Sequence, residues 1–202
     1  SCVDGFETLA SSCDGAGSCQ VDSCAATFRD CNGLAVDGCE ININSNLAHC
    51  GGCNLPCDFA HASESCNGSC QFGACFPGFV DLDGSLSNGC EYQCNVVPGP
   101  DLPDSSFTDS NCDGIDGDRN ASIFVSPLGN DGASGRWGAP VRTIGAGISR
   151  AQGLGFTTLL VAAGFYSERL DVQNGFTFAG GYNPNTWARS YANNSVIVGA
   201  PI

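Results

Sequence analysis

The sequence predicts a mainly β protein in two parts: disulfide-rich irregular repeats, then a short helix and the first strands of a β-solenoid. Three observations favour this fold. All fifteen cysteines of the 202 residues lie within the first 112. Glycine, asparagine, aspartate and serine interrupt that region every few residues, so no apolar periodicity survives in it. Beyond it, short apolar runs alternate with turn residues at nearly even spacing, as in stacked short strands.

The cysteine density indicates the compartment. Disulfides persist outside the cell or in a periplasm, and small modules that cannot bury enough apolar area use them in place of a core. We therefore expect a secreted, extracellular or cell-surface protein. The chain begins at Ser1 and contains no methionine, so we also expect that a signal peptide has been removed. No run of eighteen apolar residues occurs, and we expect no membrane span.

Most of the cysteines are expected to form disulfides, although the sequence does not fix their pairing. Cys31 and Cys94 are candidates to pair with each other, because neither has a counterpart in the other repeat. Cys112, the last of the fifteen, is predicted to stay a free thiol or to form an intermolecular bridge. The fourteen cysteines expected in disulfides are Cys2, Cys13, Cys19, Cys24, Cys31, Cys39, Cys50, Cys53, Cys57, Cys66, Cys70, Cys75, Cys90 and Cys94.

The first half contains an internal repeat with an offset of 51 residues. Residues 19–24 match residues 70–75, and the match continues without a gap to Glu40 and Glu91. From this repeat and from changes in composition we predict three regions. They are a disulfide-rich region of two imperfect repeats (1–95), a Pro/Asp-rich linker (96–121) and a short β domain that begins with a capping helix (122–202).

The second half is predicted to hold one helix and several strands. Apolar residues at 144, 148 and 151 indicate an amphipathic helix over 144–152, with Thr143 as its N-cap. Residues 161–164 and 178–181 repeat a similar apolar and glycine pattern, at a spacing typical of the coils of a β-solenoid. Strands are expected over 122–126, 157–162, 169–172, 176–179 and 195–198.

Both halves resemble known families. The stretches 129–144, 161–166 and 174–182 resemble the N-terminal entry of right-handed parallel β-helix proteins of the pectate-lyase-like superfamily. That resemblance implies that the helix caps the first coil of a right-handed parallel β-helix. Residues 30–40, followed by Cys50-Gly-Gly-Cys53, resemble the cysteine-rich repeats of large secreted bacterial surface proteins.

Charge is divided between the two halves. Residues 1–118 hold eighteen acids against one arginine, a net −17, whereas residues 119–202 hold three acids against six arginines, a net +3. Nucleic acid is not an expected partner, because phosphate binding needs clustered positive charge. The asymmetry favours head-to-tail self-association. The apolar strand near the C-terminal end is expected to be covered by another subunit or by more of the same protein.

The segment 109–118 has the pattern of a calcium loop. Oxygen-bearing side chains stand at loop positions 1, 3 and 5, and Gly114 at position 6 permits the chain to reverse, as in EF-hand loops. Asn120 replaces the usual glutamate at position 12, so Asp101 or Asp104 is expected to complete the site. The alternative is an acidic linker with Asx turns. The expected calcium ligands are Asp109, Asn111, Asp113, the Ile115 carbonyl, Asp116 and Asp118.

Other metals fit the sequence poorly. The shorter patterns beginning at Asp30 and Asp81 are better explained as Asx turns that satisfy loop amides. Haem is not expected because no Cys-x-x-Cys-His occurs, and zinc and copper are not expected because His49 and His61 are the only histidines.

Composition and resemblance together favour a structural or adhesive protein of a cell surface or extracellular matrix that assembles into fibres. We expect no enzymatic activity, because residues 122–202 offer only three acids and no nucleophile motif. The alternative is the N-terminal part of a carbohydrate-active β-helix lyase or hydrolase whose catalytic coils lie beyond this chain. A surface polysaccharide is an expected partner in either case.

Overall fold

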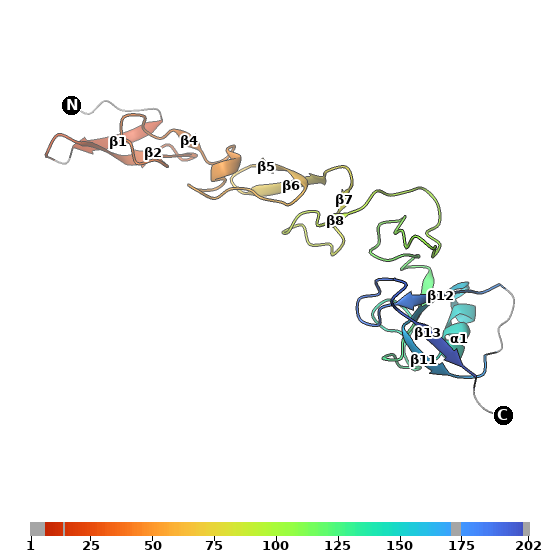
Figure 1. Cartoon of the computed structure of the whole chain (residues 1–202). Coiled ribbons are helices and arrows are strands. Elements are labelled where there is room, and N and C mark those ends of the chain that lie inside the picture. The colour runs from red at the N-terminus through yellow and green to blue at the C-terminus, as the bar shows by residue number, and fades with distance from the viewer. Residues whose placement is uncertain (1–6, 14, 171–174, 200–202) are drawn as a thin grey trace. The chain divides into compact units, whose positions relative to one another are not determined.

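The computed structural model describes residues 7–13, 15–170 and 175–199. The fold is mainly β with one α-helix, and the chain divides into two compact units, Ser1–Gln93 and Cys94–Ile202 (Figure 1). Within the described residues, no helix has the length and apolar character needed to cross a membrane.

The first unit is built from antiparallel hairpins in chain order (Figure 1). Two of them are long, and in each the cysteines next to the turn face one another, as Cys66 faces Cys70. The long hairpins are β1 (Thr8–Cys13) with β2 (Cys19–Cys24), and β5 (Ala62–Cys66) with β6 (Cys70–Cys75). The short pairs are β3 (Phe28–Arg29) with β4 (Ile41–Asn42), and β7 (Phe79–Val80) with β8 (Tyr92–Gln93); a 3₁₀ turn covers Leu47–His49.

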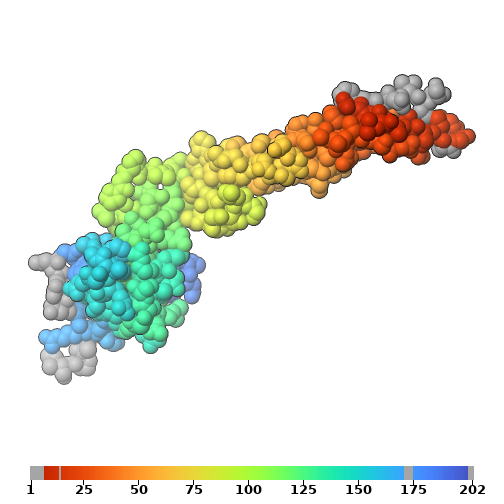
Figure 2. Space-filling model, turned by 180° about the vertical axis from the view of Figure 1, so that it is seen from behind, coloured from red at the N-terminus to blue at the C-terminus, as the bar shows by residue number. Residues whose placement is uncertain are grey.

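Disulfides take the place of an apolar core in this unit. Its buried hydrophobic residues, among those described, are four cysteines together with Ile43 and Ala62. The space-filling view shows the corresponding narrow body, coloured red to yellow (Figure 2). The bridges of the described residues include Cys24–Cys39, Cys31–Cys53, Cys50–Cys66, Cys57–Cys70, Cys75–Cys90 and Cys94–Cys112.

The bridges correct two predictions. Cys112 is not a free thiol, because it is bonded to Cys94 across 18 residues of the acidic segment. Cys31 pairs with Cys53 rather than with Cys94, so no bridge links the two imperfect repeats through that pair. Cys13 and Cys19 are also disulfide-bonded, although their own sulfur atoms are 4.0 Å apart, and Cys2 lies outside the described residues.

The second unit is organised by parallel strands. β9 (Ser122–Val125), β10 (Thr158–Ala162) and β12 (Thr177–Tyr182) form a parallel sheet in the order β12-β10-β9. β11 (Gly164–Ser167) pairs in parallel with β13 (Ser195–Val198). Each strand of the first sheet from β10 onward is thus followed by a strand of the second, and the two successive pairs stack on each other.

Both faces of the three-stranded sheet are buried. Ile123, Val125, Leu159 and Val161 face a cluster that includes the helix, while the alternate residues face a cluster with Tyr182 and Trp187. Side chains of successive strand residues point to opposite faces, so burial on both sides requires a continuous apolar run. The sequences Ile-Phe-Val of β9 and Leu-Leu-Val-Ala of β10 meet that requirement.

The helix α1 (Ile144–Leu154) begins at the predicted residue and ends two residues beyond the predicted end at Gln152. Thr143 is the N-cap, and its Oγ1 accepts from the backbone N–H of Ala146 (3.2 Å). Gly155 closes the helix in the left-handed conformation that C-caps favour. The buried side chains of Ile144, Ile148 and Ala151 pack on the sheet, which confirms the predicted apolar face.

The strand predictions are confirmed at four of five places. The structure has strands at 122–125, 158–162, 177–182 and 195–198, within two residues of the expected starts. The expected strand over 169–172 is wrong at 169–170, where the chain is irregular, and the rest of it lies outside the described residues. The strand that pairs with β13 instead begins at Gly164, whose glycine suggested a turn.

The acidic segment that we expected to be a linker packs within the second unit. Ile115 belongs to the apolar cluster on the sheet face away from the helix. Gly117 has φ +108°, and a Cβ at this position would lie 3.0 Å from Pro103 and 3.3 Å from Leu160. Because that face of the sheet is apolar, the segment serves as its cover.

The close packing of the helix on the sheet predicts that the same substitution has opposite effects on stability at two helical glycines. A Cβ at Gly147 would lie 2.8 Å from Val125 Cγ2 and 2.9 Å from Leu159 Cδ2. Gly147→Ala should therefore destabilise the protein by about 1–3 kcal/mol despite its better helix propensity. Gly153→Ala is the control, because nothing lies within 4 Å of its Cβ, and it should stabilise by up to about 1 kcal/mol. Denaturant unfolding measures both, and a Gly147→Ala variant as stable as the parent would contradict the packing.

Candidate functional site

The segment 109–118 folds as a tight loop around Asp109. The backbone N–H groups of Asp113 and Gly114 donate to its two carboxylate oxygens, at 3.1 and 2.7 Å. Cys112 (φ +60°) and Gly114 (φ +96°) both adopt left-handed backbone conformations, which reverse the chain there. Gly114 therefore has the part that the sequence assigned to it.

Asp113 lies beside Asp109 in a half-buried position. One of its oxygens accepts from the Arg119 backbone N–H (2.7 Å) and from Asn111 Nδ2 (2.9 Å). Burial is the main reason why the pKa of Asp113 is raised, and the charge of Asp109 adds to the effect. Two carboxylates and one amide of the predicted ligand set are thus brought together, and they stand in an environment that disfavours negative charge.

Asp101, one of the two residues expected to complete the site, lies close enough to Asp109 for their charges to interact. It is 4% exposed, and its Oδ2 accepts from the Gly117 backbone N–H (3.2 Å). Burial raises the pKa of Asp101 to about 6, and the charges of Asp109 and Asp116 contribute in the same direction. Asp104 does not join the group, because its Oδ1 accepts from the N–H and hydroxyl of Ser106.

The remaining predicted ligands are engaged elsewhere. Asp116, with a side chain 1% exposed, forms an ion pair with Arg189 (2.6 Å) and accepts from the Asp104 N–H (3.0 Å). Asp118 Oδ1 accepts from the backbone N–H groups of the two residues Asn120 and Ala121, at 2.7 and 3.0 Å. The loop does not gather all of the predicted ligands, because Asp116 pairs with the partly buried Arg189.

A second acidic group lies in the repeat region. Carboxylate oxygens of Asp81, Asp83 and Glu91 all lie within 4.8 Å of one another. In the described residues, the 109–118 loop forms no such group of three His, Cys, Asp or Glu side chains. The Gly84 N–H donates to Asp81 Oδ1 (2.8 Å) and the Ser85 N–H to Asp83 Oδ1 (2.8 Å). These are the Asx turns that the sequence favoured.

The first repeat has a loop like the one at Asp83, but the acid and the amide that bond across it have exchanged positions. Asn32 Nδ2 donates to Asp37 Oδ2 (2.8 Å), whereas Asn88 Nδ2 donates to Asp83 Oδ2 (3.1 Å). At an offset of 51, Asn32 corresponds to Asp83 and Asp37 to Asn88. The amide–carboxylate bond across the loop is therefore kept while both residue types change, which a comparison of single positions would not reveal.

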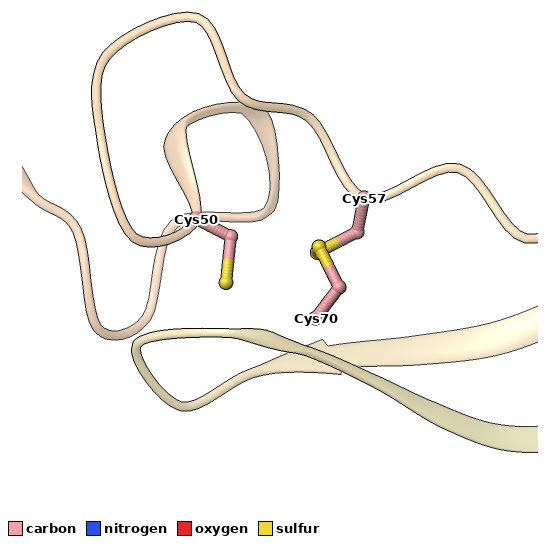
Figure 3. Close-up of side chains that lie close together, drawn as sticks. All are labelled: Cys50, Cys57 and Cys70. Carbon is pink, nitrogen blue, oxygen red and sulfur yellow. A yellow bond between two sulfur atoms is a disulfide. The ribbon is translucent and has the colours of Figure 1, made fainter. Parts of the chain in front are cut away.

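Three cysteine sulfurs meet between the repeats. Those of Cys50, Cys57 and Cys70 lie within 4.8 Å of one another (Figure 3). Such a group could bind a soft metal only as thiolates. Here Cys57 is bonded to Cys70, and Cys50 is bonded to Cys66, so the cluster is two adjacent disulfides.

The described acids of the β region accept hydrogen bonds from backbone N–H groups at the start of the helix. Glu168 accepts from the N–H groups of Ile144 (2.7 Å) and Gly145 (2.9 Å). Asp131 accepts from the N–H of Thr143 (2.8 Å), and these bonds lower the pKa of Asp131 although its partial burial opposes them. Asp171, the third acid, lies outside the described residues.

No known protein family, curated protein or solved structure matches this chain.

The ion pair between Arg189 and Asp116 generates a prediction. Arg189→Met would leave the Asp116 carboxylate buried without its cation, so it should cost about 3–5 kcal/mol. Adding Asp116→Asn should recover part of the loss, because the amide oxygen can still accept from the Asp104 N–H. Arg142→Met, at an exposed arginine, should change stability by no more than about 0.5 kcal/mol. Equal effects of Arg189→Met and Arg142→Met in denaturant unfolding would contradict this role.

Proposed function

We propose that this chain is a secreted structural or adhesive component of a cell surface or extracellular matrix, held by disulfides and calcium and able to self-associate. The observation that carries the proposal is the disulfide framework of the first unit. Described residues of that unit bury cysteines where a globular domain would bury aliphatic side chains. Such a framework is stable only where disulfides persist, and it is typical of secreted modules.

The enzymatic alternative has less support. Glu168 and Asp131, the described acids of the β region, accept backbone N–H groups around the start of α1. Retaining and inverting glycosidases both need a pair of carboxylates that face a substrate. We therefore propose a structural rather than a catalytic role for this chain.

The arrangement of the second unit supports a continuing stack of strands. β10 and β11 pair in parallel with β12 and β13, and this pairing supports the proposal because successive coils of a β-helix also pair their strands in parallel. Val196, Ile197 and Val198 of β13 are 37–52% exposed, as the sequence predicted for an open end. We propose that this unit is the entry of a parallel β-helix, and that its open end is covered in the assembled protein.

Calcium is proposed to bind between Asp101, Asp109, Asn111 and Asp113. Burial and the charge of Asp109 both raise the pKa values of Asp101 and Asp113, so a cation between these carboxylates would relieve both unfavourable effects. Calcium prefers carboxylate, amide and carbonyl oxygens, which this loop supplies. Calcium binding would hold in place the segment that covers the sheet, since Ile115 and Gly117 of that segment directly follow Asp113.

Reduction tests the structural proposal. With dithiothreitol present, the amides of hairpin β5–β6 should lose protection from hydrogen exchange, because the bridges are their main support. The amides of β9 and β10 should keep their protection, because two apolar clusters hold those strands. Hydrogen exchange followed by mass spectrometry measures both in one sample. Hairpins that stay protected after full reduction would refute a framework held by disulfides.

A melting experiment tests calcium. Calcium at 100 times its dissociation constant should stabilise the folded chain by about 2.7 kcal/mol, and EDTA should remove that gain. Asp113→Ala should abolish the response to calcium. Asp118→Ala is the matched control and should keep it, because the Asp118 carboxylate is bonded to Asn120 and Ala121 instead. A melting temperature indifferent to calcium and EDTA would refute the site.

A further inference from the structure

A groove of the second unit carries positive charge on an apolar floor. It has a volume of about 800 Å³ and lies beside the C-terminal half of α1, where Leu154 and Phe156 line it together with Arg136 and Arg150. Leu154 is 50% exposed, and the Arg136 guanidinium lies 4.7 Å from the centre of the Phe156 ring. A groove of this size can hold several side chains of a partner.

Both arginines are fixed but not neutralised. Arg150 donates through Nε to the Ala133 carbonyl (3.0 Å) and through Nη2 to the Asp131 carbonyl (3.1 Å), and Arg136 donates to the Asn120 carbonyl. Among the described residues, the only ion pair within 4.0 Å is that of Arg189 with Asp116. Two guanidinium groups without carboxylate partners at the rim of a groove favour an anionic occupant.

The first unit presents a segment with the complementary features. The loop 33–37 carries Leu34 and Val36, which are 55% and 85% exposed. Three acids, Asp30, Asp37 and Glu40, stand in or next to this loop. Asp37 Oδ1 and Glu40 Oε2 are shielded from water, so the accessible negative charge lies at Asp30 and at Asp37 Oδ2, which accept exposed hydrogen bonds from Gly33 and Asn32. An aliphatic tip with acids around it matches an apolar floor with arginines around it.

We propose that the loop 33–37 of one molecule docks into the α1 groove of a second copy of this chain. Leu34 and Val36 pack on Leu154 and Phe156, and the acids around the loop pair with Arg136 and Arg150. This inference deepens the self-association in the proposed function by naming its two surfaces. Because the surfaces differ, the contact is heterologous, so it leaves one groove and one loop free at the ends and can propagate.

Sedimentation velocity over a range of protein concentrations tests the contact. The parent chain should form a concentration-dependent series of oligomers, and raising sodium chloride from about 0.1 M to 1 M should weaken them because ion pairs are screened. The double change Leu34→Ser and Val36→Ser should reduce association at least tenfold. Leu154→Ser should do the same from the groove side. Leu9→Ser, at another exposed leucine of the first unit, and Arg142→Ala, at an exposed arginine outside the groove, should leave association unchanged.

Mixing the two defective chains gives the decisive result. The loop variant keeps an intact groove and the Leu154→Ser variant keeps an intact loop, so the mixture should form one-to-one dimers and nothing larger. A parent chain that stays monomeric at all concentrations would overturn this contact, while the disulfide and calcium tests would still stand. Association that survives both variants but is lost in Ile197→Ser would also overturn it, and would assign self-association to the open end of the strands instead.

Discussion

The scarcity of apolar side chains in the first 93 residues is the constraint on which the architecture depends. Folding must offset the conformational entropy of every ordered residue, and a segment that buries mainly cysteine cannot do so through the hydrophobic effect alone. Closing short loops with disulfides lowers the entropy of the unfolded chain instead. The bridges between described residues close loops of 13 to 22 residues, so each bridge joins parts of the chain that are near each other in the sequence.

The second unit has the opposite problem, since it has apolar surface that must be covered. Its parallel sheet is apolar on both faces, so each face needs a cover. The helix covers one face, and the acidic segment that leads into β9 covers the other through Ile115. That segment carries many carboxylates and still packs on a core, because Asp116 meets Arg189 and the other acids accept backbone N–H groups. The Cys94–Cys112 bridge holds the start of the same segment.

Acidic loops therefore have two different roles in this chain. In the repeats, carboxylates and amides close Asx turns. Asn32 and Asp37 of the first repeat are replaced by Asp83 and Asn88 in the second, yet the amide–carboxylate hydrogen bond across the loop is kept. The bond therefore matters more than the charge at either position. At the 109–118 loop, burial and the charge of Asp109 raise the pKa values of Asp101 and Asp113. Only the second situation leaves negative charge that a cation would stabilise, which is why calcium is proposed there and not in the repeats.

Local rules were sufficient for the features that local chemistry decides. The helix with its Thr143 cap, four of the strands, the short-stranded first half and the Asx turns could all be predicted, since each depends on residues close in sequence. Disulfide partners could not be predicted, because any cysteine can pair with any other until the loops are placed. Only the tertiary structure could show that Asp116 pairs with Arg189 instead of joining the other predicted calcium ligands, because the two residues lie 73 positions apart in the sequence. The sequence alone determined where the chain turns, caps and extends. The tertiary structure decided which cysteines and charges meet, because those pairings depend on distances in space that sequence spacing does not specify.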